Sequence, residues 1–178
     1  DKPLEMFNGP MQFVIENTDK TQEKFVSTDF SFTKKEVGAV AWTSEAESGN
    51  FNMVLTAQAE FDGCIEYQVT LAAKHDMSVN DIRLEIPYRN EIAEMMMGLG
   101  VHGGKRLDSF NWKWDQQKNQ DALWVGKVNA GMQTSLKDEN YVRPLNTNFY
   151  LSKPLNMPPS WFNDGKGGFT TAQAGDQY

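Results

Sequence analysis

The sequence contains a single cysteine, Cys64, so no disulfide can form within the chain. Its two histidines, His75 and His102, stand far apart and leave too few nitrogen and sulfur ligands for a zinc site. No segment approaches the roughly 20 consecutive apolar residues that a membrane-spanning helix needs. Asp62, Asp76, Asp81 and Asp138 are interpreted as solvated turn residues, with a calcium site as the alternative. We therefore expect no metal, no other cofactor and no insertion into a membrane.

Basic residues are also in deficit. Seventeen Lys and Arg stand against 24 Asp and Glu, which gives a net charge of −7 and a pI near 4.8. Such a field repels phosphate backbones and anionic lipid surfaces, so nucleic acid is not an expected partner. Neutral ligands such as carbohydrates are not disfavoured by it.

Length and composition are those of an ordinary globular protein. The 178 residues are 39% hydrophobic, 12% aromatic and 23% charged, and they are long enough to bury a core without disulfides. We expect a single domain over residues 1–178, with two small domains as the alternative.

A β-hairpin is the clearest local prediction. Apolar and polar residues alternate along 51–61 and again along 65–71, on either side of Asp62-Gly63. A two-residue loop would place the two apolar sets on opposite faces of the hairpin. A three-residue loop with its glycine at positive φ instead pairs Ala59 with Ile65, and we expect that register.

Other segments extend the β pattern. Further strands are expected at 11–15, 25–32, 36–42, 82–88, 124–132 and 149–151, the fifth of them with a bulge near its glycines. Residues 91–97 form either a short helix capped by Asn90 or another strand. Because helix is nearly absent, the prediction is a mainly β protein, an antiparallel β-sandwich with little helix, and a closed barrel is the competitor.

One glycine pattern resembles a nucleotide-binding motif. The segment 98–103 matches G-x-G-x-x-G, which holds a pyrophosphate when a strand enters it and a helix leaves it. No apolar helical period follows the segment here. We therefore expect it to be a glycine-rich connection within a sheet.

Catalytic motifs are weak. There is no G-x-S-x-G pattern, and Cys64 has no histidine nearby in the sequence. Asp108, Asp115 and Asp121 flank a tryptophan-rich segment, and glycoside hydrolysis uses two carboxylates. A chain with 24 acidic residues always contains some near pairs, so no catalytic residue is assigned.

The tryptophan-rich segment suggests a binding site. In an extended conformation Phe110, Trp112 and Trp114 share one face, and polar residues occupy the other. Exposed indole rings stack on sugar rings, while neighbouring polar groups bond hydroxyls. The hypothetical carbohydrate site comprises Trp112, Trp114, Asn111, Lys113 and Asp115. The alternative is that these rings fill the core, where large aromatic residues usually lie.

A set of short phrases from residue 62 onward carries a family resemblance. They are Asp62-Gly63 with Ile65-Glu66-Tyr67, Ile82-Arg83-Leu84-Glu85-Ile86-Pro87, Met96-Met97-Gly98-Leu99-Gly100 with Gly103-Gly104, Trp112-Lys113-Trp114-Asp115, Leu123-Trp124-Val125-Gly126 with Val128-Asn129-Ala130-Gly131, Glu139-Asn140-Tyr141 with Arg143-Pro144-Leu145, and Pro158-Pro159-Ser160-Trp161 with Asn163 and Gly165-Lys166-Gly167-Gly168. In this order they resemble the β-sandwich domain of bacterial glycoside-hydrolase-like proteins related to the β-N-acetylgalactosaminidase family.

The resemblance implies a sandwich that precedes a (β/α) barrel holding the catalytic acids. The chain has no alternating strand–helix pattern of its own, so it is expected to be part of a longer protein, located in the periplasm, at the cell surface or outside the cell. Its expected partners are that barrel and a carbohydrate.

Three functions are considered, in this order: an accessory domain involved in polysaccharide degradation, by weak glycan binding or by shaping the rim of the active site; a structural or assembly module without a ligand; and a small hydrolase using Asp115 or Asp121.

Overall fold

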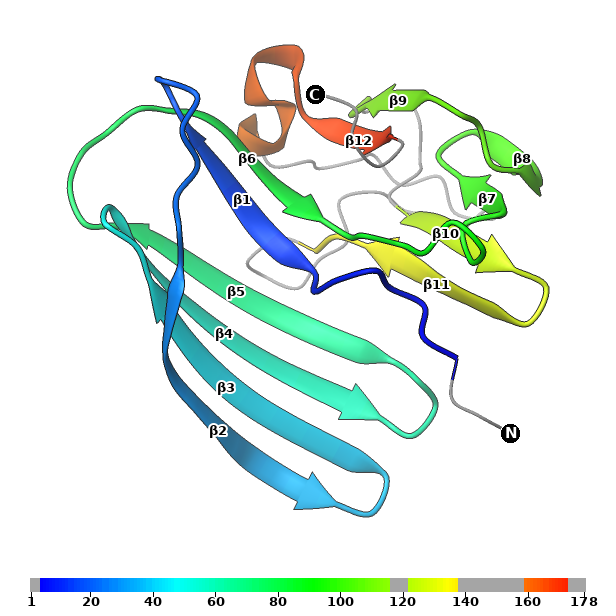
Figure 1. Ribbon diagram of the computed structural model, residues 1–178, viewed down its shortest axis with the longest axis horizontal. Helices are drawn as coiled ribbons and strands as arrows, with labels where there is room; N and C mark the ends of the chain where they lie inside the picture. The colour runs from blue at the N-terminus through cyan, green and yellow to red at the C-terminus, as the bar shows by residue number, and fades with distance from the viewer. Residues whose placement is uncertain (1–3, 116–121, 138–158, 173–178) are drawn as a thin grey trace. The chain divides into compact units, whose positions relative to one another are not determined.

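The computed structural model of the chain describes residues 4–115, 122–137 and 159–172 (Figure 1). These residues are mainly β, with antiparallel pairing throughout and one short 3-10 helix, as predicted from the sequence. They belong to two compact units, which we call the inserted unit (Met11–Ile86) and the terminal unit (Asp1–Pro10 with Pro87–Tyr178). Within the described ranges, no helix has the length and hydropathy to cross a membrane. The single sandwich domain followed by a barrel stays a prediction.

The inserted unit contains two antiparallel sheets. Its larger sheet runs in sequence order through β2 (Val26–Glu36), β3 (Ala39–Glu47), β4 (Phe51–Glu60) and β5 (Ile65–Ala73) (Figure 1). Its smaller sheet pairs β1 (Gln12–Asn17) with β6 (Val79–Glu85). Neighbouring strands of the larger sheet are joined by short turns, which contain Gly38, Gly49 and Gly63.

The hairpin between β4 and β5 has the predicted register. Ala59 stands opposite Ile65, and Gly63 has a φ of 86°. The backbone N–H of Cys64 donates a 2.9 Å hydrogen bond to the carboxylate of Asp62. The parity argument is therefore confirmed: only a three-residue loop keeps the apolar residues of both strands on one face.

That apolar face crosses all four strands of the larger sheet. One row across it consists of Phe32, Trp42, Ala57 and Tyr67. The rings of Trp42 and Tyr67 meet edge to face at 6.0 Å. Several large side chains on this face remain in solvent, including Phe30 at 54% and Tyr67 at 43% exposure. This face of the larger sheet therefore carries exposed aromatic side chains.

A half-buried carboxylate just before β2 fastens this part of the chain to the turn between β3 and β4. The Glu23 carboxylate accepts hydrogen bonds from the side-chain amides of Asn50 at 2.7 Å and Asn17 at 2.9 Å. Hydrogen bonds from Ser48, Asn50 and Asn17 lower the pKa of Glu23 from 4.5 to about 2, which outweighs the opposing effect of desolvation. The ionised form of Glu23 is therefore the one that stabilises this corner of the sheet.

Acidification should remove the stability that the ionised Glu23 carboxylate contributes. Because the folded pKa of Glu23 lies below its unfolded value, its stabilisation is present above pH 4.5 and is lost as the pH falls toward about 2. Glu23→Gln should lower the free energy of unfolding by about 1 to 2 kcal/mol near pH 6 and by almost nothing near pH 2. Urea unfolding across this range, with the exposed Glu45→Gln as control, measures the effect. Equal losses at both ends of the range would contradict it.

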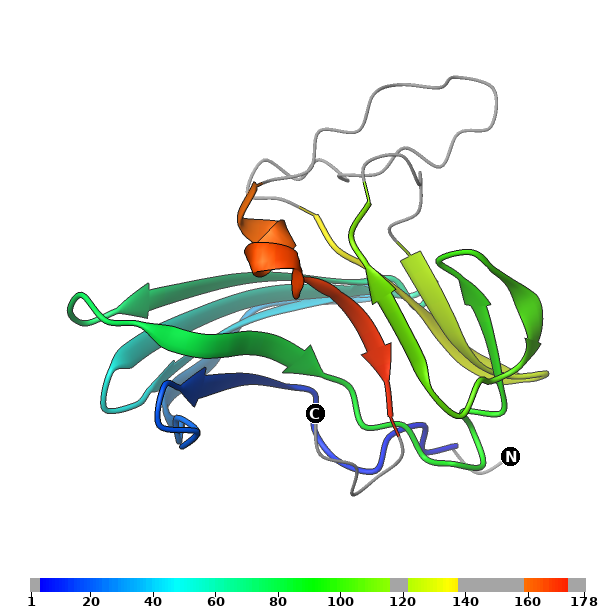
Figure 2. The same cartoon turned by 90° about the horizontal axis from the view of Figure 1, so that it is seen from above.

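The terminal unit also contains two antiparallel sheets. A four-stranded sheet has the order β11 (Ala130–Ser135), β10 (Ala122–Lys127), β7 (Met95–Gly98) and β8 (Val101–Lys105). The second pairs β9 (Phe110–Lys113) with β12 (Gly168–Thr171), which follows the 3-10 helix η1 (Pro159–Gly165) (Figure 2).

The predicted strand over 124–132 is wrong. The chain reverses at Val128-Asn129, and Lys127 pairs with Ala130 across a two-residue turn. Met132 therefore stands opposite Val125 rather than sharing the face of Trp124. The reversal lets both halves of the segment share one core face, which a single bulged strand would not. The expected strand at 149–151 lies outside the described residues. Of the segment 91–97, predicted as a short helix or a strand, residues 91–94 form a turn and residues 95–97 belong to β7.

The glycine motif is a sheet connection, as predicted. Gly98 pairs with Val101, and Leu99-Gly100 forms the two-residue turn between β7 and β8. Gly98, Leu99 and Gly100 have φ values of 111°, 50° and 86°. Leu99 is buried although its backbone is left-handed, so its side chain is held there by the core.

Candidate functional site

The tryptophan-rich segment lies in the core of the terminal unit. Trp112, on β9, stands opposite Phe169 of β12. The backbone N–H of Trp114 donates a 3.1 Å hydrogen bond to the Gly167 carbonyl. Trp112 is 7% exposed and Trp114 is 8% exposed. Neither indole ring therefore presents an open face to solvent.

Trp114 is the centre of an aromatic cluster. Its ring lies 5.1 Å from that of Trp112, 5.2 Å from that of Trp161 and 5.4 Å from that of Phe169. The contact with Trp112 is edge to face, at 89°, which is the arrangement that the ring quadrupoles favour. The buried apolar residues of this core are Met96, Leu99, Trp112, Trp114, Leu123 and Val125.

The polar residues of the segment point the other way. Asn111 and Lys113 are exposed, and Lys113 donates a 2.5 Å hydrogen bond to the Lys166 carbonyl. Asp115 is half-buried. The structure thus separates the rings from Asn111 and Lys113, which favours the alternative that the rings fill the core; the carbohydrate site at these residues stays a prediction.

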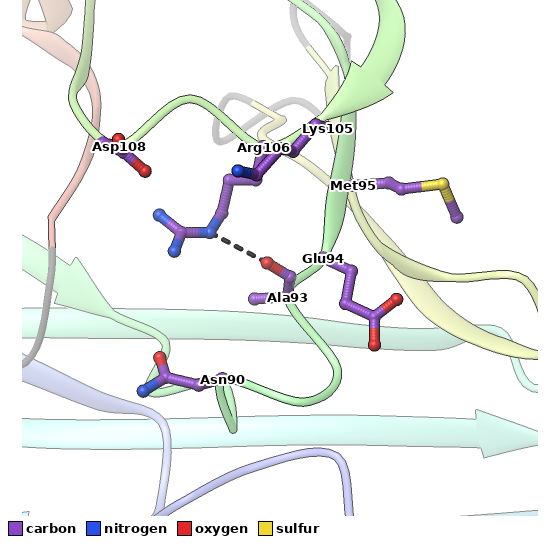
Figure 3. A pocket seen from close by; sticks show the side chains of 7 residues that line it. All are labelled: Asn90, Ala93, Glu94, Met95, Lys105, Arg106 and Asp108. Atoms are coloured by element: carbon purple, nitrogen blue, oxygen red, sulfur yellow. Dashed lines mark hydrogen bonds between the residues drawn. The ribbon is translucent and has the colours of Figure 1, made fainter.

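A second candidate is an open pocket on the same unit (Figure 3). Its volume is about 550 Å³. The residues that line it are Asn90, Ala93, Glu94, Met95, Lys105, Arg106 and Asp108. This combination offers amide, carboxylate and cationic groups to a ligand, without an aromatic ring.

Arg106 is the best-positioned side chain of the pocket. Its Nε donates a 2.8 Å hydrogen bond to the Ala93 carbonyl, and its Nη1 donates a 3.2 Å hydrogen bond to the Leu107 carbonyl. Figure 3 shows its guanidinium and the carboxylate of Asp108 on the same side of the pocket. A guanidinium held by backbone carbonyls keeps its remaining N–H groups directed at a ligand. The sequence reasoning missed Arg106, because a lone arginine after a glycine-rich strand carries no motif.

Residues 1–178, the whole chain, match the family described as glycoside hydrolase 123, third domain. The chain belongs to this family. No curated protein and no solved structure matches it significantly. The expectation of an accessory domain from a glycoside-hydrolase family is thereby confirmed.

In this glycoside hydrolase 123 third domain, the acidic residues that we considered for hydrolysis do not lie together at one place. Asp115 follows β9, Asp121 lies outside the described residues, and Asp108 lines the pocket. Glu94 lines the same pocket. Within the described ranges, no three His, Cys, Asp or Glu side chains come together to hold a metal ion. Cys64 is exposed at a hairpin of the inserted unit.

Proposed function

We propose that the chain is a non-catalytic domain of a larger glycoside hydrolase related to the β-N-acetylgalactosaminidases, and that it contacts carbohydrate beside a catalytic barrel. The observation that carries the proposal is the match of all 178 residues to a family defined as a third domain. The net charge of −7 supports a neutral ligand rather than a polyanion.

The same relationship supports a location in the periplasm or outside the cell, where polymeric glycans are degraded. The pocket around Arg106 adds chemical support, because it presents hydrogen-bond donors and acceptors of the kind that bind hydroxyl and acetamido groups. Its volume suits a single sugar unit better than a long polymer segment.

A structural or assembly module is the second candidate. The burial of Trp112 and Trp114 favours it, because rings that fill a core stabilise the domain rather than bind a ligand. The exposed apolar face of the inserted unit, which includes Phe30 and Tyr67, also favours it. A module of this kind would pack that face against another part of the enzyme.

The isolated chain should show no glycosidase activity, because the proposal places the reacting acids in another domain. A set of 4-nitrophenyl glycosides that includes the N-acetyl-β-galactosaminide measures this through release of nitrophenol. The carboxamide variants Asp115→Asn, Asp108→Asn and Glu94→Gln provide the matched set. Turnover by the chain that disappears in one of these variants would overturn the non-catalytic assignment.

A further inference from the structure

Trp124 lies on the face of the four-stranded sheet that is turned away from the aromatic core. Its neighbours in sequence, Leu123 and Val125, are buried in that core, so the alternation of β10 places Trp124 on the opposite face. Directly opposite Trp124 stand Met97 on β7 and Gln133 on β11. These three side chains form one row across the sheet.

The indole ring of Trp124 lies on glycine backbone. A Cβ atom at Gly126 would come within 2.7 Å of the ring carbon Cζ2 of Trp124. A Cβ atom at Gly131 would come within 2.6 Å of Cε2 and 2.9 Å of Nε1. Gly126 and Gly131 stand opposite one another on β10 and β11, so together they provide a flat seat for the ring. A larger residue at Gly131 would push against the ring, whereas one at Gly126 would first meet the backbone of Gly131 and Ala130.

Part of the Trp124 side chain remains exposed on this face. Trp124 is half-buried and is not among the residues that pack against the core. Its neighbour Met97 is 50% exposed, and Gln133 is exposed. With one ring face on the glycine backbone, the other face is directed away from the sheet. The row therefore presents an aromatic surface with a thioether on one side and an amide on the other.

The row adjoins the pocket described above. Met95 stands opposite Gly126 on the Trp124 face of the sheet, and it also lines the pocket. Lys105 stands opposite Met95 and likewise lines the pocket. A ligand on the ring would thus have polar groups within reach on two sides: Gln133 along the row, and the pocket beyond Met95.

We infer that this face of the sheet β11-β10-β7-β8 is a carbohydrate-binding surface, in which Trp124 stacks on the apolar face of a neutral pyranose ring and Gln133 bonds its hydroxyls. A sugar ring has an apolar C–H face bordered by hydroxyls, which matches a flat indole beside an amide. The acidic chain disfavours anionic ligands. The choice of a carbohydrate as the ligand rests on the proposed function. The position of the binding surface at Trp124 rests on the geometry of the sheet alone.

The test follows the five indole N–H signals in ¹H–¹⁵N spectra of the 178-residue chain. Trp124→Phe assigns the signal of Trp124 by its disappearance. Methyl N-acetyl-β-galactosaminide, cellotetraose and xylotetraose are the neutral probes, and heparin is the anionic comparison. At least one neutral probe should shift the Trp124 signal in a saturable manner, while heparin should not.

Two variants then locate the site. Trp124→Ala should weaken binding of that probe roughly tenfold or more, since it removes the stacking surface. Gly131→Ala keeps all five indole rings but lifts that of Trp124, and it should weaken binding several-fold. Trp42→Ala, in the inserted unit, is the matched control and should leave the affinity unchanged. Dispersed amide signals in each variant establish that the terminal unit is still folded.

The outcomes separate the two proposals. If a neutral probe binds equally well to the wild type, Trp124→Ala and Gly131→Ala, the surface is not at Trp124, although carbohydrate contact by the domain stands. If no neutral probe shifts the Trp124 signal and none binds, both the surface and the carbohydrate contact are overturned, and the structural module remains. Shifts of the Trp124 signal by heparin alone would overturn the neutral-ligand assignment.

Discussion

Replacing Trp114 with alanine is expected to lower the free energy of unfolding by about 3 to 5 kcal/mol. Its ring contacts Trp112, Trp161 and Phe169, so the substitution leaves a large cavity at the centre of the core. β9, β12 and the segment containing η1 all contribute to this cluster, and the neighbouring rings cannot collapse into the space without breaking the pairing of β9 with β12. Urea unfolding monitored by far-ultraviolet circular dichroism measures the loss.

Two further variants serve as controls for Trp114→Ala. Trp114→Phe retains an aromatic ring in the cluster and should cost less than half as much as the alanine variant. Trp124→Ala removes a half-buried ring that lies outside the core, so its loss of stability should also be smaller. If Trp114→Ala instead leaves stability unchanged and abolishes glycan binding, Trp114 acts as a surface platform and the burial argument is wrong.

Replacing Gly98 with alanine is expected to cost about 3 kcal/mol or more. The residue has a φ of 111°, a conformation that side chains with a Cβ rarely adopt. A Cβ atom there would also overlap the backbone carbonyl of Ala122 on the paired strand β10. Because the obstacle is backbone rather than a flexible side chain, β7 and β10 would have to separate.

A glycine series distinguishes the two causes. Gly100 has a φ of 86° but open space around its Cβ position, so Gly100→Ala should cost only the conformational strain, about 1 kcal/mol. Gly49 has neither a positive φ nor a neighbour within 4 Å, and Gly49→Ala should change stability by less than about 0.5 kcal/mol. Thermal unfolding of the three variants should rank them in this order. Equal losses at Gly98 and Gly100 would show that the close approach to β10 is unimportant.

The alternation of apolar and polar residues predicted the local β structure well. It placed the β4–β5 hairpin in its register, with Ala59 opposite Ile65, because a shift by one residue would have divided the apolar residues between two faces. It also assigned the glycine segment at 98–103 to a sheet, because no helical period follows it. Both conclusions depend only on neighbours in the sequence.

The sequence alone could not decide which face of a strand packs against the core and which faces solvent. Trp112 and Trp114 share a face in any extended strand, but whether solvent or core lies beyond it depends on Trp161 and Phe169, which come about 50 residues later. The turn at Val128-Asn129 was missed for a similar reason. Asn129 is a turn residue, but the reversal has no glycine or proline of its own, and the apolar residues on both sides of it share one parity, which favoured a continuous strand.

The order of the segments along the chain has a consequence for synthesis on the ribosome. All strand pairs of the inserted unit lie within residues 11–86, so this unit can complete its sheets early in translation. The terminal unit must wait for β12, the last strand that the structure describes, before β9 finds its partner. Until then Trp112 and Trp114 lack Trp161 and Phe169, so the nascent chain carries unshielded aromatic surface beside an already folded unit. Chaperone binding and premature termination should therefore act mainly on the terminal unit.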